Sequence, residues 1–188
     1  MATQAEIRDG FKFRGGHPAL DLAATVSGRL GATPRDHLAG PGDLDRWLVA
    51  SGLAETAPGA GELDLILARQ LREALYRLAL ARAEGRELTA DDRDLLNQIA
   101  SRPAAPAWLG EDGRARLAGD AAGLLALLAR EGVALLGGES ADRIRQCEGP
   151  PCAVLFVDTS RKGQRRWCSM SACGNRAKAA GFRAREKG

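Results

Sequence analysis

The sequence predicts an α+β fold that is mainly helical. An N-terminal helical domain with short strands is expected over residues 1–140, followed by a small module of a hairpin and a helix over residues 141–188. Hydrophobic residues make up 45% of the 188 residues, enough for one core, whereas aromatic residues make up only 4%. Ala, Leu and Arg abound, a composition that favours helices over aromatic-rich sandwiches or barrels. Leucines also recur at spacings of three and four in the long segments, as one face of a helix requires.

The first predicted elements are short. Residues 11–13 alternate aromatic and basic side chains, as in a half-buried strand, and Gly15-Gly16 predicts a turn. The apolar residues of segment 20–26 are compatible with either a strand or a short helix. Residues 27–42 are rich in Gly and Pro and predict a loop, after which a short helix is expected over residues 43–52.

Longer helices follow. The clearest helix spans residues 62–83, and Gly85 fits as its C-cap. Thr89 with Asp92 resembles a capping box at the start of the next helix. Residues 107–118 have the character of a hairpin, and a further helix is expected from about residue 120 to 136. The apolar face of the first of these helices is formed by Leu67, Leu71, Leu75 and Leu78.

Charge is distributed unevenly along the chain, although the net charge is only +3. Residues 1–142 hold 16 Lys/Arg and 21 Asp/Glu, whereas residues 143–188 hold 11 Lys/Arg and 3 Asp/Glu. A mildly acidic body thus carries a strongly basic tail. Such asymmetry indicates a polyanionic partner for the tail, most often nucleic acid or an anionic membrane surface.

All four cysteines lie in this basic tail and follow the pattern C-x4-C-x15-C-x4-C. Two close pairs joined by a medium spacer can bring four thiolates to one tetrahedral Zn²⁺ ion. Free thiols or disulfides are the alternative, but the N-terminus lacks a signal-peptide stretch, and paired cysteines in a reducing cytoplasm more often bind metal. Four thiolates leave no open coordination position, so the expected role is structural. We expect one zinc ion, held by Cys147, Cys152, Cys168 and Cys173.

The spacer between the cysteine pairs predicts a hairpin. Residues 153–157 form an apolar run typical of a strand, residues 158–164 a turn-rich loop, and residues 165–167 a short return strand. The second cysteine pair is expected at the start of a helix over residues 172–187, with Ser171 as its N-cap. The first cysteine pair, with Gly149-Pro150-Pro151 between its members, is expected to form a tight turn, which we call the first knuckle. The order of knuckle, hairpin and helix resembles that of a treble-clef zinc finger. His17 and His37 lie far from the cysteines in sequence, so we expect them to be surface or partly buried side chains and not metal ligands.

These motifs resemble a known family. The stretches FVDTSRKG (156–163), RRWCSM (165–170) and CGNRAK (173–178) are similar to the CGNR zinc finger, a bacterial module. The front of the chain, with its Leu20-Asp21-Leu22 segment, resembles the ABATE domain that usually precedes this finger. Ala24 stands where that family commonly has Asn. Proteins of this architecture are described as stress-induced transcription regulators, which implies a DNA-binding role here.

The leading functional hypothesis is a cytoplasmic, zinc-containing, DNA-binding transcription regulator. Its basic hairpin and helix would contact duplex DNA, and phosphate contacts of this kind give affinity without sequence choice. Asn175 and Arg176 could read base edges or, alternatively, support the zinc site, and the excess charge of the thiolates would itself be offset by nearby cations. The candidate nucleic-acid contacts are Arg161, Lys162, Arg165, Arg166, Asn175, Arg176, Lys178, Arg183 and Lys187.

Other function classes make different use of the N-terminal domain. It could bind a small effector or a protein partner, with Gly15-Gly16 and Asp21 lining a pocket or serving only in a turn and a cap. The chain could also be an interaction or sensing protein that binds protein, RNA or a small ligand and not DNA. No nucleophile elbow, phosphate loop or zinc-hydrolase motif is found, so an enzyme is not expected. No apolar run has the length of a membrane span, and a homodimer is compatible with the sequence.

Overall fold

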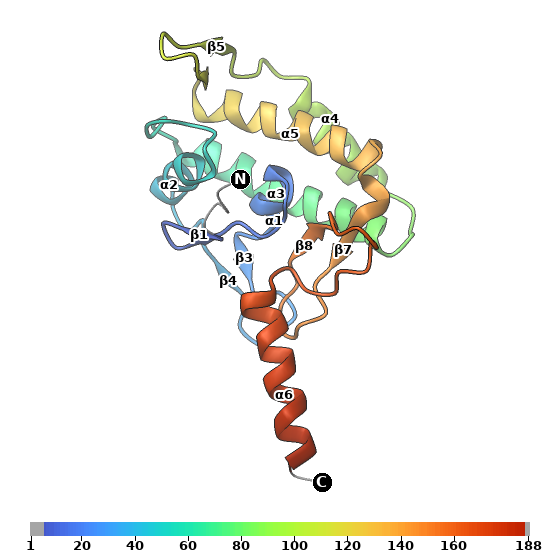
Figure 1. Ribbon diagram of the computed structural model, residues 1–188. Helices are drawn as coiled ribbons and strands as arrows, with labels where there is room; N and C mark the ends of the chain where they lie inside the picture. Colours follow the sequence, from blue (N-terminus) through green and yellow to red (C-terminus); the bar gives the residue numbers. More distant parts are fainter. Residues whose placement is uncertain (1–5, 187–188) are drawn as a thin grey trace.

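Helix α3 (Glu62–Ala83) is the axis of the fold in the computed structural model, which describes residues 6–186. Helices α4 (Ala90–Ala100) and α5 (Ala121–Gly137) pack against α3 and against each other, and the short α1 (Pro18–Ala23) lies between α3 and α5 (Figure 1). Helix α2 (Pro41–Ser51) packs at one end of α3. The described residues are mainly helical, which confirms the predicted class.

The leucine pattern of α3 explains its place at the centre. Leu67, Leu71, Leu75 and Leu78 are all buried, and the helix begins and ends at the predicted residues. The ambiguous segment before Val26 is the helix α1, whose residues Ala19–Ala23 are all buried. Gly15 allows α1 to approach the preceding turn, since a Cβ there would lie 2.6 Å from the Cβ of Leu20.

Four small antiparallel sheets of two strands each surround these helices in the described residues. They pair β1 with β2, β3 with β4, β5 with β6, and β7 with β8. The predicted hairpin over 107–118 is confirmed, whereas the stretch 27–42 contains a strand that the sequence did not indicate. The bounds are Ile7–Arg8 (β1), Phe11–Lys12 (β2), Val26–Ser27 (β3), Arg35–Asp36 (β4), Ala107–Leu109 (β5), Ala115–Leu117 (β6), Ile144–Gln146 (β7) and Leu155–Val157 (β8).

One local prediction is wrong. Thr89 is the N-cap residue of α4, but its side chain does not accept a hydrogen bond from the helix. Its hydroxyl instead donates to Asp92 Oδ2 at 2.7 Å, and Arg77 of α3 binds the same carboxylate. The expected capping box is therefore replaced by a link between α3 and α4.

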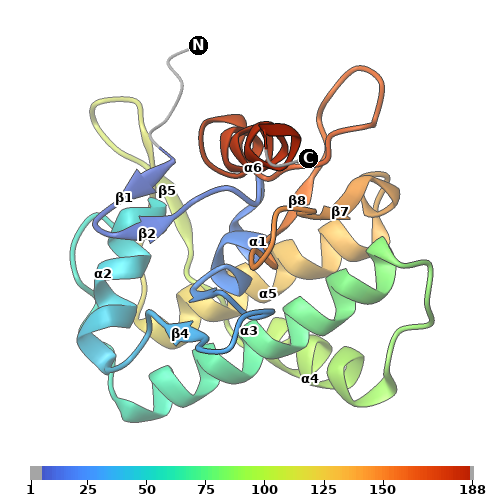
Figure 2. The same cartoon turned by 90° about the horizontal axis from the view of Figure 1, so that it is seen from below.

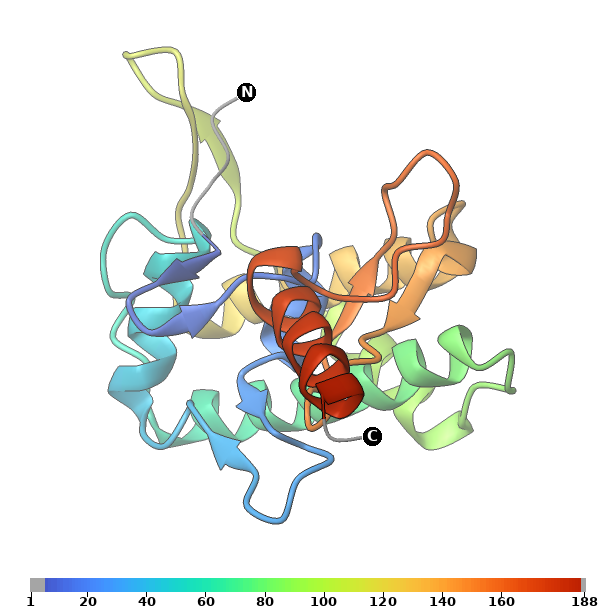
Figure 3. The same ribbon diagram turned by 60° about the horizontal axis from the view of Figure 1, so that its bottom comes forward.

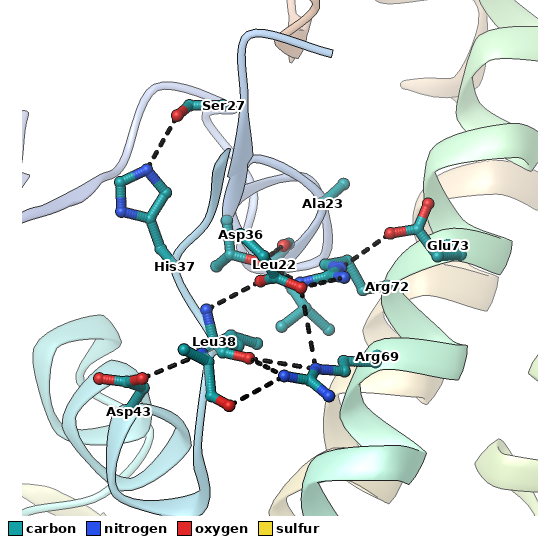
Figure 4. A network of polar contacts seen from close by, with 12 residues as sticks. Leu22, Ala23, Ser27, Asp36, His37, Leu38, Asp43, Arg69, Arg72 and Glu73 are labelled. Carbon is teal, nitrogen blue, oxygen red and sulfur yellow. Dashed lines mark hydrogen bonds and ion pairs between the residues drawn. The ribbon is translucent and has the colours of Figure 1, made fainter. Parts of the chain in front are cut away.

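A buried arginine fixes the β3–β4 segment to α3 (Figure 4). Arg72, whose side chain is 6% exposed, donates to both carboxylate oxygens of Asp36 at 2.6 and 2.9 Å. Arg69, about one turn earlier, donates to the carbonyl oxygen of Leu38. Glu73 accepts from Arg72 and from Arg29, so the charges form a continuous chain of ion pairs from Arg29 to Asp36.

The β7–β8 pair belongs to two clusters of buried side chains. Ile144, Leu155 and Val157 lie in the large core formed by the helices, whereas Phe156 packs with the cysteines. The main-chain N–H of Val157 also donates to the carbonyl oxygen of Gly15 at 2.9 Å. The domain boundary that we expect between residues 140 and 141 stays a prediction. The strands β7 and β8, which follow this position, contribute side chains to the core of the helices.

Helix α6 (Asn175–Glu186) projects away from the rest of the molecule (Figures 1 and 3). Viewed along its axis, it lies over α1, between the β1–β2 pair and the β7–β8 pair (Figure 2). Its main contact is with the helical turn that precedes it. None of the helices in residues 6–186 has the length and apolar composition needed to cross a membrane.

Candidate metal centre and nucleic-acid interface

The first cysteine pair lies in the turn that joins β7 to β8. The N–H of Cys147 donates to the carbonyl oxygen of Val154 at 2.9 Å, and the N–H of Cys152 donates to that of Gly149 at 2.8 Å. Gly149 leaves room for the second pair, because a Cβ at this position would lie 3.0 Å from the Cβ of Cys173 and would press against it. The hairpin thus forms around the first knuckle. The prediction of a return strand at residues 165–167 is wrong, because these residues form no strand and β8 pairs with β7 instead.

In the second cysteine pair, Cys168 precedes a single π-helical turn, Met170–Gly174, and Cys173 lies within it. Helix α6 continues from this turn. Ser169, and not the expected Ser171, is the N-cap residue, and its hydroxyl oxygen accepts from the N–H of Ala172 at 3.3 Å. Glu6 accepts hydrogen bonds from the hydroxyls of Ser169 and Ser171, so β1 is tied to this turn. Nothing in the sequence pattern of Glu6 indicates this long-range contact.

The four sulfur atoms have the spacing of a tetrahedral zinc site. The Sγ atoms lie within 4.8 Å of one another, and the Cys152–Cys168 and Cys168–Cys173 distances are 3.8 and 3.7 Å. Zn–S bonds of about 2.3 Å at tetrahedral angles require sulfur separations of about 3.8 Å. The four thiols are free, and three of them are buried. The arrangement fits one structural zinc ion.

The four clustered thiols cannot all ionise easily without a metal ion. A hydrogen bond to Cys147 raises the pKa values of Cys152 and Cys168, because it favours their protonated form, and the negative charge of a neighbouring thiolate raises them further. A divalent cation removes this conflict by binding all four as thiolates and releasing their protons. Arg176 donates to Cys173 Sγ at 3.0 Å, and this hydrogen bond raises the pKa of its guanidinium. Arg176 therefore offsets part of the thiolate charge.

A buried aspartate closes the loop between the two halves of the site. Asp158 follows β8, and its carboxylate accepts from the N–H groups of Ser160 and Arg165, both at 2.8 Å. Burial raises the pKa of Asp158, but these hydrogen bonds outweigh it and hold the pKa below its ordinary value of 3.8. Asp158 was expected only as part of a loop. Its position directly after an apolar strand, followed by Ser and Gly, is the signal that could have identified it.

Asp158→Ala is expected to destabilise the finger by about 1–3 kcal/mol, because two N–H groups lose their acceptor. Since the native pKa is lowered, the stabilisation by Asp158 is fully present above pH ~4 and is lost as the pH falls through the native pKa. Amide hydrogen exchange at Ser160 and Arg165 and thermal unfolding as a function of pH measure this. Equal unfolding curves for the variant and the wild type at pH 7 would contradict it.

Two of the candidate nucleic-acid contacts are committed to the metal centre. Arg165 donates to the carbonyl oxygens of Trp167 and Cys168, and its guanidinium lies 4.7 Å from the centroid of the Phe156 ring. Arg176 binds Cys173 as described above. Asn175 donates from Nδ2 to the carbonyl oxygen of Ser171 at 3.3 Å, within the first turn of the helix.

The remaining candidates differ in their surroundings. Arg166 is paired with Glu148 at 2.6 Å and lies over the Trp167 ring. Arg161 and Lys162 are exposed in the 158–164 loop, and their side chains form no hydrogen bond or ion pair with another described residue.

Lys178 and Arg183 on α6 are likewise exposed, and their side chains have no partner among the side chains that the structure describes, which leave out those of residues 181 and 184–186. They line a shallow hollow with Ala179 and Phe182. Lys187 lies outside the described residues. Four of the predicted cations therefore have no partner among the described side chains.

A mainly helical N-terminal unit joined to a four-cysteine zinc finger is the class of protein that this fold and site define. Residues 16–139 match the ABATE family, described as "Putative stress-induced transcription regulator", and the chain belongs to this family. Residues 143–186 match the CGNR zinc finger. No protein of curated function matches the chain.

Proposed function

We propose that this protein is a zinc-dependent transcription regulator that binds duplex DNA through α6 and the 158–164 loop. The observation that carries the proposal is the isolation of α6. The helix leaves the body beyond the second cysteine pair (Figure 1). Lys178 and Arg183 lie exposed on it. A regulator of this kind would act in the cytoplasm, with the N-terminal unit binding an effector or a protein partner.

The dimensions of α6 suit the major groove of DNA. Its 12 residues span about 18 Å, and a helix with side chains has a diameter of roughly 10–12 Å, close to the groove width of about 12 Å. Little of the described body packs along the helix, so a duplex could approach it. The zinc site fixes the start of α6 relative to the 158–164 loop, which carries Arg161 and Lys162.

Within this proposal the cations have different roles. Arg165 and Arg176 support the metal centre, because their guanidinium groups bind the backbone and a sulfur of the second cysteine pair. Asn175 supports the start of the helix through Ser171. The cations that contact phosphates are those whose charges have no partner among the described side chains: Arg161, Lys162, Lys178 and Arg183.

Replacing Arg161, Lys162, Lys178 and Arg183 together with Gln is expected to weaken duplex DNA binding roughly tenfold or more at moderate salt, equally on unrelated sequences, because phosphate contacts are lost. Fluorescence anisotropy with labelled duplexes measures this. The zinc content of the variant is expected to be unchanged.

The matched control removes the same charge from the N-terminal unit. Its four sites are exposed arginines whose side chains form no hydrogen bond or ion pair with a described residue: Arg35, Arg82, Arg102 and Arg114. Equal losses in both variants would mean that net charge alone drives binding. If the zinc-loaded protein binds no DNA at low salt, the regulator proposal fails and the protein-interaction alternative replaces it.

A further inference from the structure

A small polar pocket is lined by residues from β1, from the segment that follows β2, from the start of α1 and from the end of α2. Its volume is about 300 Å³, and its lining includes Arg8, Phe13, His17, Asp21 and Ser51. The pocket lies in the N-terminal unit and shares no lining residue with the metal centre.

Arg8 supplies a positive charge without a carboxylate partner. Its guanidinium carbon lies 3.6 Å from the centroid of the Phe13 ring, and its Nε is buried without a hydrogen-bond acceptor. No carboxylate of the described residues lies within 4.0 Å of its guanidinium nitrogens. The adjacent residues 1–5, MATQA, contain no acidic side chain.

Asp21 supplies a negative charge to the same pocket. Its side chain is held by the N–H of Gly15, which donates to Oδ1 at 2.8 Å, and the residue is 9% exposed. Burial raises the pKa of Asp21 to about 6, so the carboxyl is largely ionised at pH 7 but weakly stabilised. It forms no ion pair within 4.0 Å with a residue in the described part of the chain.

The other titratable group in the pocket does not neutralise Asp21. His17 accepts the N–H of Ala19 at Nδ1, so its proton is on Nε2, which lies 3.7 Å from Glu131. Burial lowers the pKa of His17, which keeps the ring neutral at pH 7. The pocket therefore presents one cation and one anion. The charge of Arg8 lowers the pKa of Asp21 from a distance, but among the described residues the two form no ion pair within 4.0 Å.

Two opposite charges held apart in one pocket are complementary to a molecule that carries both. An isolated anion such as phosphate would satisfy Arg8 but be repelled by Asp21, and an isolated cation would meet the reverse conflict. We propose that this pocket binds a small zwitterion of the size of an α-amino acid, with its carboxylate on Arg8 and its ammonium on Asp21. The inference deepens the proposed effector role of the N-terminal unit and rests on it for its biological meaning.

The pocket is connected to the zinc finger through one residue. Gly15 donates its N–H to Asp21, and its carbonyl oxygen accepts from the N–H of Val157 in β8. The preceding residue of that strand, Phe156, packs against the cysteines. A ligand that changes the position of Asp21 therefore acts two hydrogen bonds away from the strand beneath the metal centre.

Binding is tested on the zinc-loaded full-length protein without DNA. The 20 standard L-amino acids are screened by thermal shift, and hits are measured by isothermal titration calorimetry. At least one is expected to raise the unfolding temperature, and Arg8→Gln and Asp21→Asn are each expected to weaken its binding at least tenfold. Asp21→Asn keeps the acceptor for Gly15. The matched controls, Arg35→Gln and Asp142→Asn, remove the same charges outside the pocket and are expected to leave affinity unchanged.

The unmodified protein supplies a second test that does not depend on the variants folding. Analogues of the best ligand that lack either the amine or the carboxylate are expected to bind at least tenfold more weakly. The proposal is overturned if no amino acid binds, if either one-charge analogue binds as well as the zwitterion, or if both pocket variants bind normally. Loss of DNA binding alone would overturn the proposed regulator function and leave this binding result intact.

Discussion

Replacing Cys173 with Ser is expected to abolish stoichiometric zinc binding and to unfold the finger. Cys173 is buried and contributes one of four sulfurs to the site, and its Sγ also accepts a hydrogen bond from Arg176. Structural zinc contributes about 10–16 kcal/mol to small metal-dependent domains, and the buried side chains around these cysteines are few. Elemental analysis under reducing conditions is expected to give about one zinc per wild-type chain and almost none for the variant.

The unfolding is expected to remain local, with a defined edge. The backbone amides of residues 147–154 and 158–186 should lose their protection from hydrogen exchange, while those of α3 and α5 stay protected. Because Leu155 and Val157 lie in the core of the helices, the β7–β8 strands are expected to lose protection only in part. Thr159→Ala, at an exposed position in the 158–164 loop of the finger, serves as the control and should behave as wild type. Full zinc content in the Cys173 variant would contradict the site.

Arg72→Met is expected to destabilise the N-terminal unit by about 2–4 kcal/mol and to lower its unfolding temperature by roughly 5–15 °C. The guanidinium is buried and bidentate to Asp36, and it also binds Glu73 (Figure 4). Met keeps much of the apolar volume but removes every hydrogen bond, so Asp36 loses its main partner. Because Asp36 is partly exposed, water recovers some of the loss, which places the effect below that of a fully buried pair.

The same helix provides the control for this prediction. Arg82→Met removes an exposed arginine whose side chain has no partner in the described part of the chain, and its effect is expected to stay within about 0.5 kcal/mol. Chemical denaturation followed by circular dichroism measures both variants. Equal stabilities of the Arg72 and Arg82 variants would mean that the buried network contributes nothing net.

The elements that the sequence predicted well are those in which a local pattern sets the structure. Helix α3 follows its leucine spacing from Glu62 to Ala83, and the sulfur cluster follows the cysteine spacing, since neither depends on a distant segment. The β7–β8 pair was missed because its pairing spans the first knuckle, and a three-residue strand such as β7 leaves little signal.

The roles of the basic residues could not be read from charge alone. Arg161 and Arg165 lie in the same short stretch, but only the guanidinium of Arg165 folds back onto the carbonyl groups of the second cysteine pair. Which arginine does so depends on the path of the loop, which Asp158 fixes through two backbone hydrogen bonds. Arg8 and Asp21, 13 positions apart, enter one pocket only when the β1–β2 turn packs beside α1.

Zinc-dependent binding of duplex DNA through the free cations of the finger is tested most directly by the salt dependence of affinity. Anisotropy titrations of the zinc-loaded protein, from about 50 to 200 mM salt, are expected to give a log–log slope of about −3 to −4, at about −0.9 for each of four phosphate contacts. Chelated protein is expected to lose most of this binding. A slope near zero, or equal binding with and without zinc, would contradict the account.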